Sequence, residues 1–301
     1  MADNYIEYKM DDIRRGHKPE TEEQIRRRVM KRREAERQVA SQNLDTDYKE
    51  YLAHALEWAE SAGRIQLKHF RNVHLQRQTK LNNFDVVTMA DKESERLIIE
   101  SIKQTYPHHS ILSEESGAQG VEKSEWRWVI DPLDGTTNFS QGLPIFSVSI
   151  ALEHNGKVVA GVVHAPYLGE TFHAVRGGGA WLNGKKLAVS EKTDLTAMVV
   201  ATGMPYDRDR NPDNNLDNIS RVCLQVRGTR RMGSAAIDLA YTAAGFYDAY
   251  WELNLNPWDV DAGILLVEEA GGVVESIREN RNCSILACSA KTMKVFRKLV
   301  K

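Results

Sequence analysis

Apolar residues mark four helix-like stretches in this chain. They cover residues 45–70, 91–104, 234–244 and 257–270. In the first two, apolar side chains recur every three or four residues, which is the spacing of one helix face. Pro107 follows the second stretch, and Gly245 and Gly271 follow the last two, as is common where helices end. We predict a helix over each stretch.

Short runs rich in β-branched and aromatic residues lie between the second and third of these helices. They cover residues 126–131, 146–153 and 157–164. The last two flank Asn155-Gly156, which is the strongest short hairpin signal in a sequence. Glycines 177–179 indicate another strand pair, and Asn183-Gly184 marks a further turn. These hairpins exclude a purely parallel βαβ array, so we expect a protein of mixed α and β structure.

The first 44 residues differ from the rest of the chain. They contain few large apolar residues, and six of the ten positions from 24 to 33 are Lys or Arg. We expect a charged extension that is either a solvated helix or disordered. A basic arm for nucleic acid or a protein partner is the alternative, although the interleaved Glu34 and Glu36 argue against it.

Composition narrows the class of protein. The chain has 301 residues, 42% of them hydrophobic and 27% charged, with a formal net charge of -2. These values exclude a wholly disordered chain and a global basic field for nucleic acid or lipid. Three cysteines are too few for a disulfide framework, and the apolar runs are shorter than the ~20 residues that span a bilayer. With its charged, non-apolar N-terminus, the chain is expected to be soluble and cytoplasmic.

The most informative stretch is Trp-Val-Ile-Asp-Pro-Leu-Asp-Gly-Thr-Thr-Asn-Phe, residues 128–139. Asp131 ends an apolar strand, and Asp134 follows three residues later, so one tight loop brings two carboxylates together. Adjacent carboxylates raise each other's pKa unless a cation neutralises them, and hard oxygen ligands suit Mg²⁺. The alternative is that Asp131 only caps the strand and that Asp134-Gly135 forms an ordinary turn.

Gly135, Thr136 and Thr137 follow this loop at once. Consecutive backbone N–H groups there form a cradle for an anion if a helix begins at this point. Carboxylates for a metal beside amides for an anion are what metal-assisted hydrolysis of a phosphate ester requires.

Other acidic residues extend the pattern. Glu114 and Glu115 lie in a short Leu-Ser-Glu-Glu-Ser-Gly loop before residue 126. Asp259 lies in the first turn of an apolar helix beside Pro257, and Asp91 lies at another helix start. Each has a plainer interpretation as well: a surface turn for the glutamates, a helix-dipole role for Asp259 and an N-cap for Asp91.

Taken together, these motifs resemble the inositol monophosphatase family, within the superfamily that includes fructose-1,6-bisphosphatases and bisphosphate nucleotidases. The resemblance covers roughly residues 45–290. It rests on the block at residues 128–139 and on Trp-Asp-Val-Asp-Ala-Gly at residues 258–263, which Glu-Glu-Ala-Gly-Gly follows. The Glu-Glu-Ser loop upstream of the first block strengthens it.

The resemblance implies a layered αβαβα sandwich that combines α+β and α/β parts. Beyond the extension at residues 1–44, an α+β half with an antiparallel sheet would cover residues 45–193. An α/β half would cover residues 194–301, with the metal site between the halves. The resemblance also implies a homodimer, and inhibition by Li⁺ at the second metal position.

The same resemblance implies a set of metal ligands and a Mg²⁺ cofactor of two to three ions per site. Glu114, Asp131 and the carbonyl of Leu133 match the ligands of one ion. Asp131, Asp134 and Asp259 match those of a second, so Asp131 would bridge the two. Glu114 also matches a ligand of a third, weakly held ion.

Catalytic and substrate-binding roles follow from the resemblance too. Glu114 and Thr136 match the pair that orients and deprotonates the attacking water, and Asp91 matches the partner of the threonine hydroxyl. Lys80 falls where the family has a lysine near the metal loop, with a less certain role. The positions that match contacts to phosphate or to the inositol hydroxyls are Gly135, Thr136, Ala235 and Glu252.

Two features depart from the family pattern. The extension at residues 1–44 is not part of the common domain. The segment after Gly272 is shorter than usual and runs quickly into Arg278-Glu-Asn-Arg-Asn-Cys283, which puts the local sheet geometry in doubt. This segment is expected to lie away from the metal ligands.

Three functional hypotheses result. The first is a Mg²⁺-dependent phosphatase that hydrolyses inositol monophosphate or a similar small polyol phosphate. Asn138-Phe139, at the end of the block at residues 128–139, and Glu252 favour this hypothesis. The second keeps this chemistry for fructose-1,6-bisphosphate, histidinol phosphate or a 3'-phosphonucleotide. The third is an RNA- or transcription-complex-binding protein of the same fold, suggested by the basic extension and by Arg227, Arg230 and Arg231.

Overall fold

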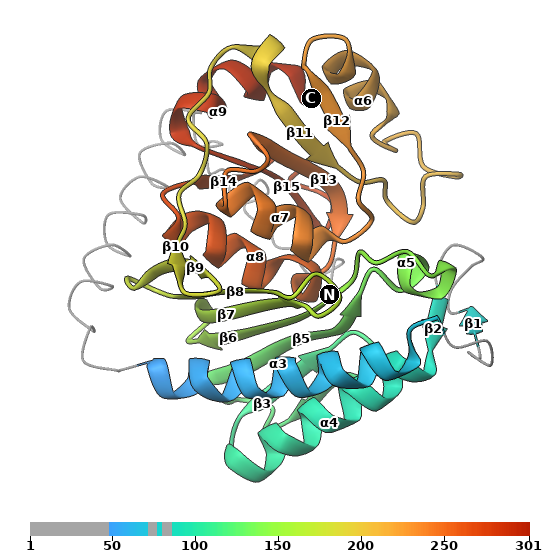
Figure 1. The fold of residues 1–301 in the computed structure, drawn as a ribbon, viewed down its shortest axis with the longest axis vertical. Coiled ribbons are helices and arrows are strands. Elements are labelled where there is room, and N and C mark those ends of the chain that lie inside the picture. Colours follow the sequence, from blue (N-terminus) through green and yellow to red (C-terminus); the bar gives the residue numbers. More distant parts are fainter. Residues whose placement is uncertain (1–47, 72–76, 80–85) are drawn as a thin grey trace, which may run out of the picture. The chain divides into compact units, whose positions relative to one another are not determined.

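The computed structural model describes residues 48–71, 77–79 and 86–301, which belong to a compact unit over Tyr48–Lys301. The predicted extension and Lys80 lie outside the described residues. None of the helices in the described part of the chain is long and apolar enough to cross a membrane. Figure 1 shows the elements of the unit in chain order.

An eight-stranded sheet forms the first layer of strands, in the order β10-β9-β8-β7-β6-β5-β3-β4. Its strands are β3 (Ser110–Ser113), β4 (Gly117–Gly120), β5 (Trp126–Asp134), β6 (Ser147–His154), β7 (Lys157–Ala165), β8 (Glu170–Val175), β9 (Gly179–Leu182) and β10 (Lys185–Lys186). Every neighbouring pair is antiparallel except β3 and β5, which are parallel. The predicted hairpins at Asn155-Gly156 and Asn183-Gly184 join β6 to β7 and β9 to β10.

Two long helices, α3 (Lys49–His69) and α4 (Met89–Thr105), cover one face of this sheet. Alternate residues of the central strands face them, since Trp128 and Ile130 pack with Ala59 and Ile98 in one buried cluster. A small antiparallel pair, β1 (Arg77–Thr79) and β2 (Val86–Thr88), precedes α4. The sheet thus buries a continuous apolar face beneath α3 and α4.

A five-stranded sheet in the order β12-β11-β13-β15-β14 forms the second layer of strands. Its strands are β11 (Val199–Thr202), β12 (Gly228–Arg230), β13 (Ala249–Leu255), β14 (Val273–Ser276) and β15 (Cys283–Cys288). β11 runs parallel to β12 and β13, whereas β15 is antiparallel to β13 and β14. A short 3-10 helix, η1 (Leu195–Ala197), precedes β11.

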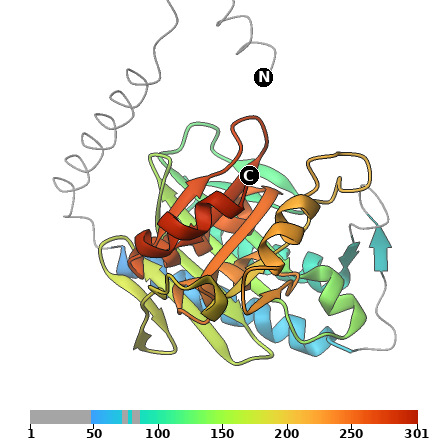
Figure 2. The same ribbon diagram turned by 90° about the horizontal axis from the view of Figure 1, so that it is seen from above.

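Helices α7 (Ala235–Ala243) and α8 (Pro257–Glu269) fill the space between the two sheets. Their apolar side chains share one buried cluster with Val129 and Val163 of the first sheet and Tyr250 of the second. The outer face of the second sheet packs on α6 (Leu216–Cys223), α9 (Ala290–Phe296) and the 3-10 turn η2 (Arg297–Leu299). Seen from above, α9 lies over this sheet (Figure 2).

Helices and sheets therefore alternate in five layers, which confirms the expected αβαβα sandwich. All four predicted helices are present, with ends within a few residues of the expected ones. A short additional helix, α5 (Thr136–Gln141), follows β5 at the predicted metal loop. The plainer interpretation of Asp91 as an N-cap does not hold: Thr88 caps α4, and Asp91 is the third residue of the helix in a capping box with Thr88. Threonine and an acid three residues later satisfy each other's free N–H groups, which favours this arrangement.

Candidate active site

The end of β5 carries the two aspartates of the predicted metal loop. The pairing of β5 with β6 shifts in register between Asp131 and Asp134, so both side chains leave the regular strand close together. The N–H of Leu133 donates to Asp131 Oδ1 at 2.9 Å, and the buried Gln66 of α3 donates to the carbonyl of Pro132 at 2.8 Å. The loop is therefore fixed from within and by the helix layer beneath it.

Asp134 connects the loop to the C-terminal half of the chain. Its Oδ2 accepts a 2.5 Å hydrogen bond from Ser234 Oγ and a 2.9 Å bond from the N–H of Ala236. Ser234 is the N-cap of α7, and the predicted substrate residue Ala235 is the first residue of that helix. The carboxylate thus lies at a helix N-terminus, which stabilises negative charge.

Glu114 follows β3, which runs parallel to β5, and its N–H donates to the carbonyl of Ile130 at 3.1 Å. Its side chain forms a hydrogen bond with Asp131. Glu95 of α4 holds the same loop from below, because its Oε1 accepts from Ser113 Oγ at 2.5 Å and from the N–H of Ser116 at 3.0 Å. A buried glutamate that the sequence analysis missed therefore positions Glu114.

Asp259 reaches the site from α8, in the layer between the two sheets. It is the third residue of that helix, and its Oδ2 accepts a 2.7 Å bond from the N–H of Asn256 at the helix start. Pro257 opens the helix at a position where no N–H donor is needed. Pro257 thus fixes where α8 begins, and the N–H of Asn256 fixes the orientation of the Asp259 carboxyl group.

Burial and mutual repulsion dominate the electrostatics of these carboxylates. Burial first, and then the charges of Glu114 and neighbouring aspartates, raise the pKa of Asp131 and Asp259 well above the ordinary value. Burial is also the largest cause that raises the pKa of Asp134, to about 6, with a hydrogen bond from Ser234 acting against it. Asp131, Asp134 and Asp259 therefore resist ionisation first because they are buried and then because other carboxylates lie nearby.

The donor chemistry of this cluster fits a hard divalent cation. All its side chains are carboxylates, the ligand type that Mg²⁺ prefers, and their repulsion is what such an ion relieves. Within the described residues, however, no three His, Cys, Asp or Glu side chains are grouped closely enough to hold an ion as they stand.

Thr136 and Asp91 form a hydrogen-bonded pair beside the carboxylates. Thr136 Oγ1 lies 3.0 Å from Asp91 Oδ1 and 3.0 Å from the carbonyl oxygen of Leu133, so its one proton has two acceptors. Thr88 donates to Asp91 Oδ2 through its N–H at 2.8 Å and its hydroxyl at 2.5 Å. Burial raises the pKa of Asp91 to about 6. The threonine hydroxyl is thus held at a fixed point.

Gly135 begins α5 with φ at 91°, in the left-handed region. A Cβ at this position would lie 2.8 Å from the carbonyl oxygen of Ile145, so only glycine fits both the conformation and the space. Asn138 ties the helix to the other half, because Nδ2 donates to the carbonyls of Ile145 at 2.9 Å and Met232 at 2.7 Å. The side-chain amide nitrogen of Asn138 therefore stabilises the position of α5 by binding backbone carbonyls.

A cavity of about 320 Å³ opens beside the acids. Of the predicted residues, those that line it are Asp134, Asn138, Ala235, Glu252 and Asp259. Asp131, Glu114, Thr136 and Asp91 are not in its lining, so the cavity contacts the carboxylate cluster through Asp134 and Asp259.

Glu252 of β13 presents its carboxyl group to this cavity. Tyr250 lies two residues earlier on the same strand face and donates its hydroxyl to Glu252 Oε2 at 2.6 Å. Burial raises the pKa of Glu252 to about 7. Tyr250 therefore fixes the orientation of a carboxyl group that accepts or donates hydrogen bonds near neutral pH.

Several residues around the site have no marker in the sequence. Ser234 follows Gly233 before an apolar helix, which is an N-cap signal, but nothing in the sequence says that its hydroxyl reaches Asp134. The cavity wall at residues 203–208, which includes Tyr206 and Arg208, had no motif to mark it. Arg231, one of the three arginines considered for RNA binding, also lines this cavity.

The chain is similar to known proteins over most of its length. The sequence profile of the inositol monophosphatase family matches residues 47–300. The chain is 40% identical over 247 residues to the inositol-1-monophosphatase of Mesorhizobium japonicum, which covers 81% of this chain and 93% of that protein. It is 47% identical over 221 residues to the Nus factor SuhB of Pasteurella multocida, covering 73% and 82%.

Solved structures show the same similarity. The extragenic suppressor protein suhB from Bartonella henselae superposes with a TM-score of 0.77 at 41% identity, over 83% of this chain and 98% of that one. The inositol monophosphatase from Anabaena gives a TM-score of 0.76 at 38% identity, over 84% and 96%. Both similarities cover most of the chain, including the layered unit described above.

Proposed function

The chain belongs to the inositol monophosphatase family, and from that premise we propose that it is a Mg²⁺-dependent phosphatase. Its substrate is inositol 1-phosphate or a similar small polyol phosphate, which it hydrolyses to the alcohol and inorganic phosphate. One observation carries the proposal: four carboxylates from both halves of the chain, Glu114, Asp131, Asp134 and Asp259, repel one another next to a polar cavity.

The carboxylates have the chemistry to hold the ions. Glu114, Asp131 and the Leu133 carbonyl would bind one, and Asp131, Asp134 and Asp259 a second. Mg²⁺ ions held there would neutralise charge on the phosphoryl group and on the entering and leaving oxygens, and would favour ionisation of the attacking water. The protein's own contribution is to hold its acids in place with N–H and hydroxyl donors from Leu133, Ser234 and Asn256.

Thr136 and Glu114 act on the attacking water. Asp91 and the Leu133 carbonyl hold the hydroxyl oxygen of Thr136 at one point, so that this oxygen accepts a hydrogen bond from the water. The Glu114 carboxylate takes the water's proton as the oxygen approaches phosphorus. The P–O bond to the alcohol then breaks, and the leaving alkoxide oxygen takes a proton from a solvent water to give the alcohol. Positioning of this kind, rather than covalent chemistry by the protein, is what phosphoryl transfer needs.

The remaining residues bind the substrate on its two sides. The N–H groups of Gly135 and Thr136 at the start of α5 face the phosphate, which the left-handed turn at Gly135 permits. On the alcohol side, Ala235 and Glu252 line the cavity, and Glu252 is oriented by Tyr250 to bind a polyol hydroxyl.

The test is phosphate release from a panel of esters, each with and without MgCl₂. The panel contains inositol 1-phosphate, fructose-1,6-bisphosphate, histidinol phosphate and a 3'-phosphonucleotide. We expect Mg²⁺-dependent hydrolysis with the highest kcat/KM for inositol 1-phosphate. A preference for another ester would still support Mg²⁺-dependent hydrolysis but would contradict the role of Glu252 in binding an inositol hydroxyl. Hydrolysis of none of them would contradict the proposal.

A role as a Nus factor is the second candidate, favoured by the relatives that carry this name. Arg227 and Arg230, beside the cavity-lining Arg231, are exposed on the C-terminal half and give it local positive charge. RNA binding by the full chain should weaken steeply with salt and be lost when residues 1–44 are removed. Binding that is independent of salt would contradict this role.

A further inference from the structure

One wall of the cavity is a long loop between β11 and α6, residues 203–215, which we call the pocket loop. Gly203, Met204, Pro205, Tyr206 and Arg208 of this loop line the cavity, as do Ala235 and Glu252. Because Gly203 adjoins the Glu252 carboxyl group, the loop borders the part of the cavity that we assign to the alcohol part of a bound ester.

Asn215 closes the base of the pocket loop. It is buried and adopts a left-handed backbone with φ at 73°, which asparagine tolerates better than most residues. Its Nδ2 donates to Thr202 Oγ1 at 2.9 Å and to the Gly203 carbonyl at 2.7 Å. Its Oδ1 accepts from Trp251 Nε1 at 2.8 Å, beside Glu252 on β13. Both ends of the loop are thus attached to the strands that carry the site.

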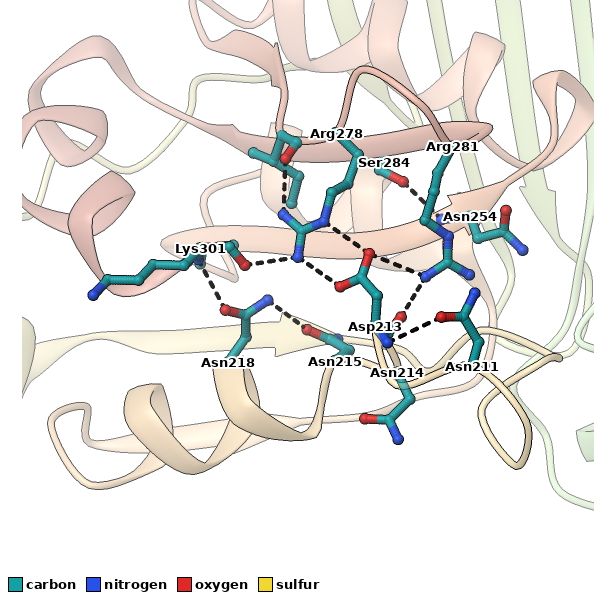
Figure 3. Close-up of polar contacts among 12 residues, drawn as sticks. Asn211, Asp213, Asn214, Asn215, Asn218, Asn254, Arg278, Arg281, Ser284 and Lys301 are labelled. Carbon is teal, nitrogen blue, oxygen red and sulfur yellow. Dashed lines mark hydrogen bonds and ion pairs between the residues drawn. The ribbon is translucent and has the colours of Figure 1, made fainter. Parts of the chain in front are cut away.

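Two arginines hold the middle of the loop, and both come from the short segment between β14 and β15. Arg281 Nη2 donates to both oxygens of Asp207 at 2.8 and 2.9 Å. Arg278 contacts Asp213 through Nε at 2.8 Å and Nη2 at 2.7 Å, and Arg281 Nη1 donates to the Asp213 carbonyl. Figure 3 shows Arg278 and Arg281 converging on Asp213 from one side.

These contacts differ from ordinary surface ion pairs. The side chain of Arg281 is only 10% exposed, and its contact with both oxygens of Asp207 fixes the two partners in one geometry. Arg278 also donates to the carbonyl of Lys301, which anchors it to the C-terminus. The segment after Gly272, expected to lie away from the metal ligands, therefore contacts the loop that forms one wall of the cavity.

We propose that Arg281 and Arg278 are positioning residues that set the selectivity of the site for the alcohol part of its substrate. They hold Asp207 and Asp213 so that Tyr206 and Arg208 keep their places in the cavity wall. The inference rests on the proposed phosphatase function. It assigns the shortened segment between β14 and β15 a role in substrate recognition without placing either arginine in contact with the phosphate.

The test compares two esters in the same variants. Arg281→Gln and Asp207→Asn remove the same ion pair from opposite sides, and Arg176→Gln is the matched control. Arg176 pairs with Glu268 at 3.0 Å and donates to a backbone carbonyl, but it is not in the cavity lining. On this proposal the alcohol part of bound inositol 1-phosphate reaches the pocket loop. The single methyl group of methyl phosphate is too small to reach it.

We expect KM for inositol 1-phosphate to rise roughly tenfold in Arg281→Gln and Asp207→Asn, with kcat little changed, because a small displacement of a binding wall weakens positioning. The kinetics of methyl phosphate hydrolysis should stay at the wild-type level in both variants, as should both reactions in Arg176→Gln. Hydrogen exchange at residues 204–214 should accelerate only in the two pocket-loop variants.

Other outcomes overturn the inference. An equal loss with both esters would mean that the arginines only stabilise the fold, and an unchanged KM for inositol 1-phosphate would mean that the loop does not need them. A wild-type protein that hydrolyses neither ester would defeat the proposed function, and this inference with it. If the wild type hydrolyses both esters and the variants change the kinetics of both esters equally, the proposed function stands and only the role of the arginines is contradicted.

Discussion

Gly203 and Glu252 share a space that holds only one side chain. A Cβ built at Gly203 would overlap the carboxyl group of Glu252, which Tyr250 holds from the other side. The backbone of Gly203 is not in the left-handed region that favours glycine. The requirement for glycine at this position therefore comes from the neighbouring carboxyl group and not from backbone strain.

Gly203→Ala should displace the Glu252 carboxyl group from the cavity. We expect KM for inositol 1-phosphate to rise roughly tenfold, because loss of one polyol contact costs on the order of 1–3 kcal/mol. Steady-state kinetics with Glu252→Ala and the double variant provide the check. The methyl group added by Gly203→Ala fits once Glu252 is truncated, so the double variant should be no worse than Glu252→Ala alone. Additive losses would mean that the two residues act separately.

Asp134→Asn and Asp259→Asn should each lower kcat at least ~10³-fold while the fold persists. Each asparagine keeps an oxygen that accepts from Ser234 or Asn256, but it removes a charge that the divalent ions need. Turnover at saturating Mg²⁺ and a circular dichroism spectrum measure the two effects. Asp217→Asn, at an exposed position in the first turn of α6, should behave like wild type. Near-normal activity in either site variant would refute the ligand assignment.

In EDTA, Asp134→Asn should be more stable than wild type at neutral pH. Burial raises the pKa of Asp134 from 3.8 to about 6, so the folded protein binds this proton more tightly than the unfolded chain. The stability that Asp134 contributes is present below pH ~4 and lost as pH rises through about 6. The difference in unfolding free energy between variant and wild type should grow over this range to about 3 kcal/mol.

Thermal melts from pH ~4 to pH ~8, with EDTA or with MgCl₂, measure this difference. Added Mg²⁺ should stabilise wild type above pH ~6, because an ion that binds only the folded state shifts the equilibrium toward it. The same addition should have a smaller effect on Asp134→Asn. A difference between the two proteins that stays constant with pH would contradict the raised pKa of Asp134.

Thr136→Val should reduce kcat about 10²-fold and leave KM nearly unchanged, since the hydroxyl is proposed to orient the water rather than the ester. Valine keeps the shape of threonine but has no oxygen for the bonds to Asp91 and Leu133. Thr136→Ser restores the hydroxyl and should recover most of the rate. If Thr136→Ser is as slow as Thr136→Val, the methyl group rather than the hydroxyl is what the site requires.

The helices, the hairpins and the local motifs were predicted well because they depend on short-range patterns, whereas the layered arrangement was expected from the resemblance to the family. The buried apolar run in β5 and the hairpin at Asn155-Gly156 fix the first sheet. The proline that opens α8 fixes the position of Asp259. These signals lie within a few residues of the structure that they determine.

Long-range contacts escaped prediction for a physical reason. Ser234 reaches Asp134 across 100 residues of chain, and Arg281 reaches Asp207 across 74. Each partner alone looks like a helix cap or a surface charge, so only the packing of the layers shows what it contacts. For Asp91, the pattern indicated a helix start correctly, but the threonine three residues earlier supplied the cap.

The bond between Asp134 and the start of α7 has a mechanical consequence. Asp134 belongs to the first sheet, whereas Ser234 and Ala236 belong to the helix layer against which the second sheet packs. The distances between the carboxylates of the site therefore depend on how the layers are aligned. A binding partner that slides one layer past the other by a fraction of an ångström would change the reactivity of the site while leaving every helix and strand intact.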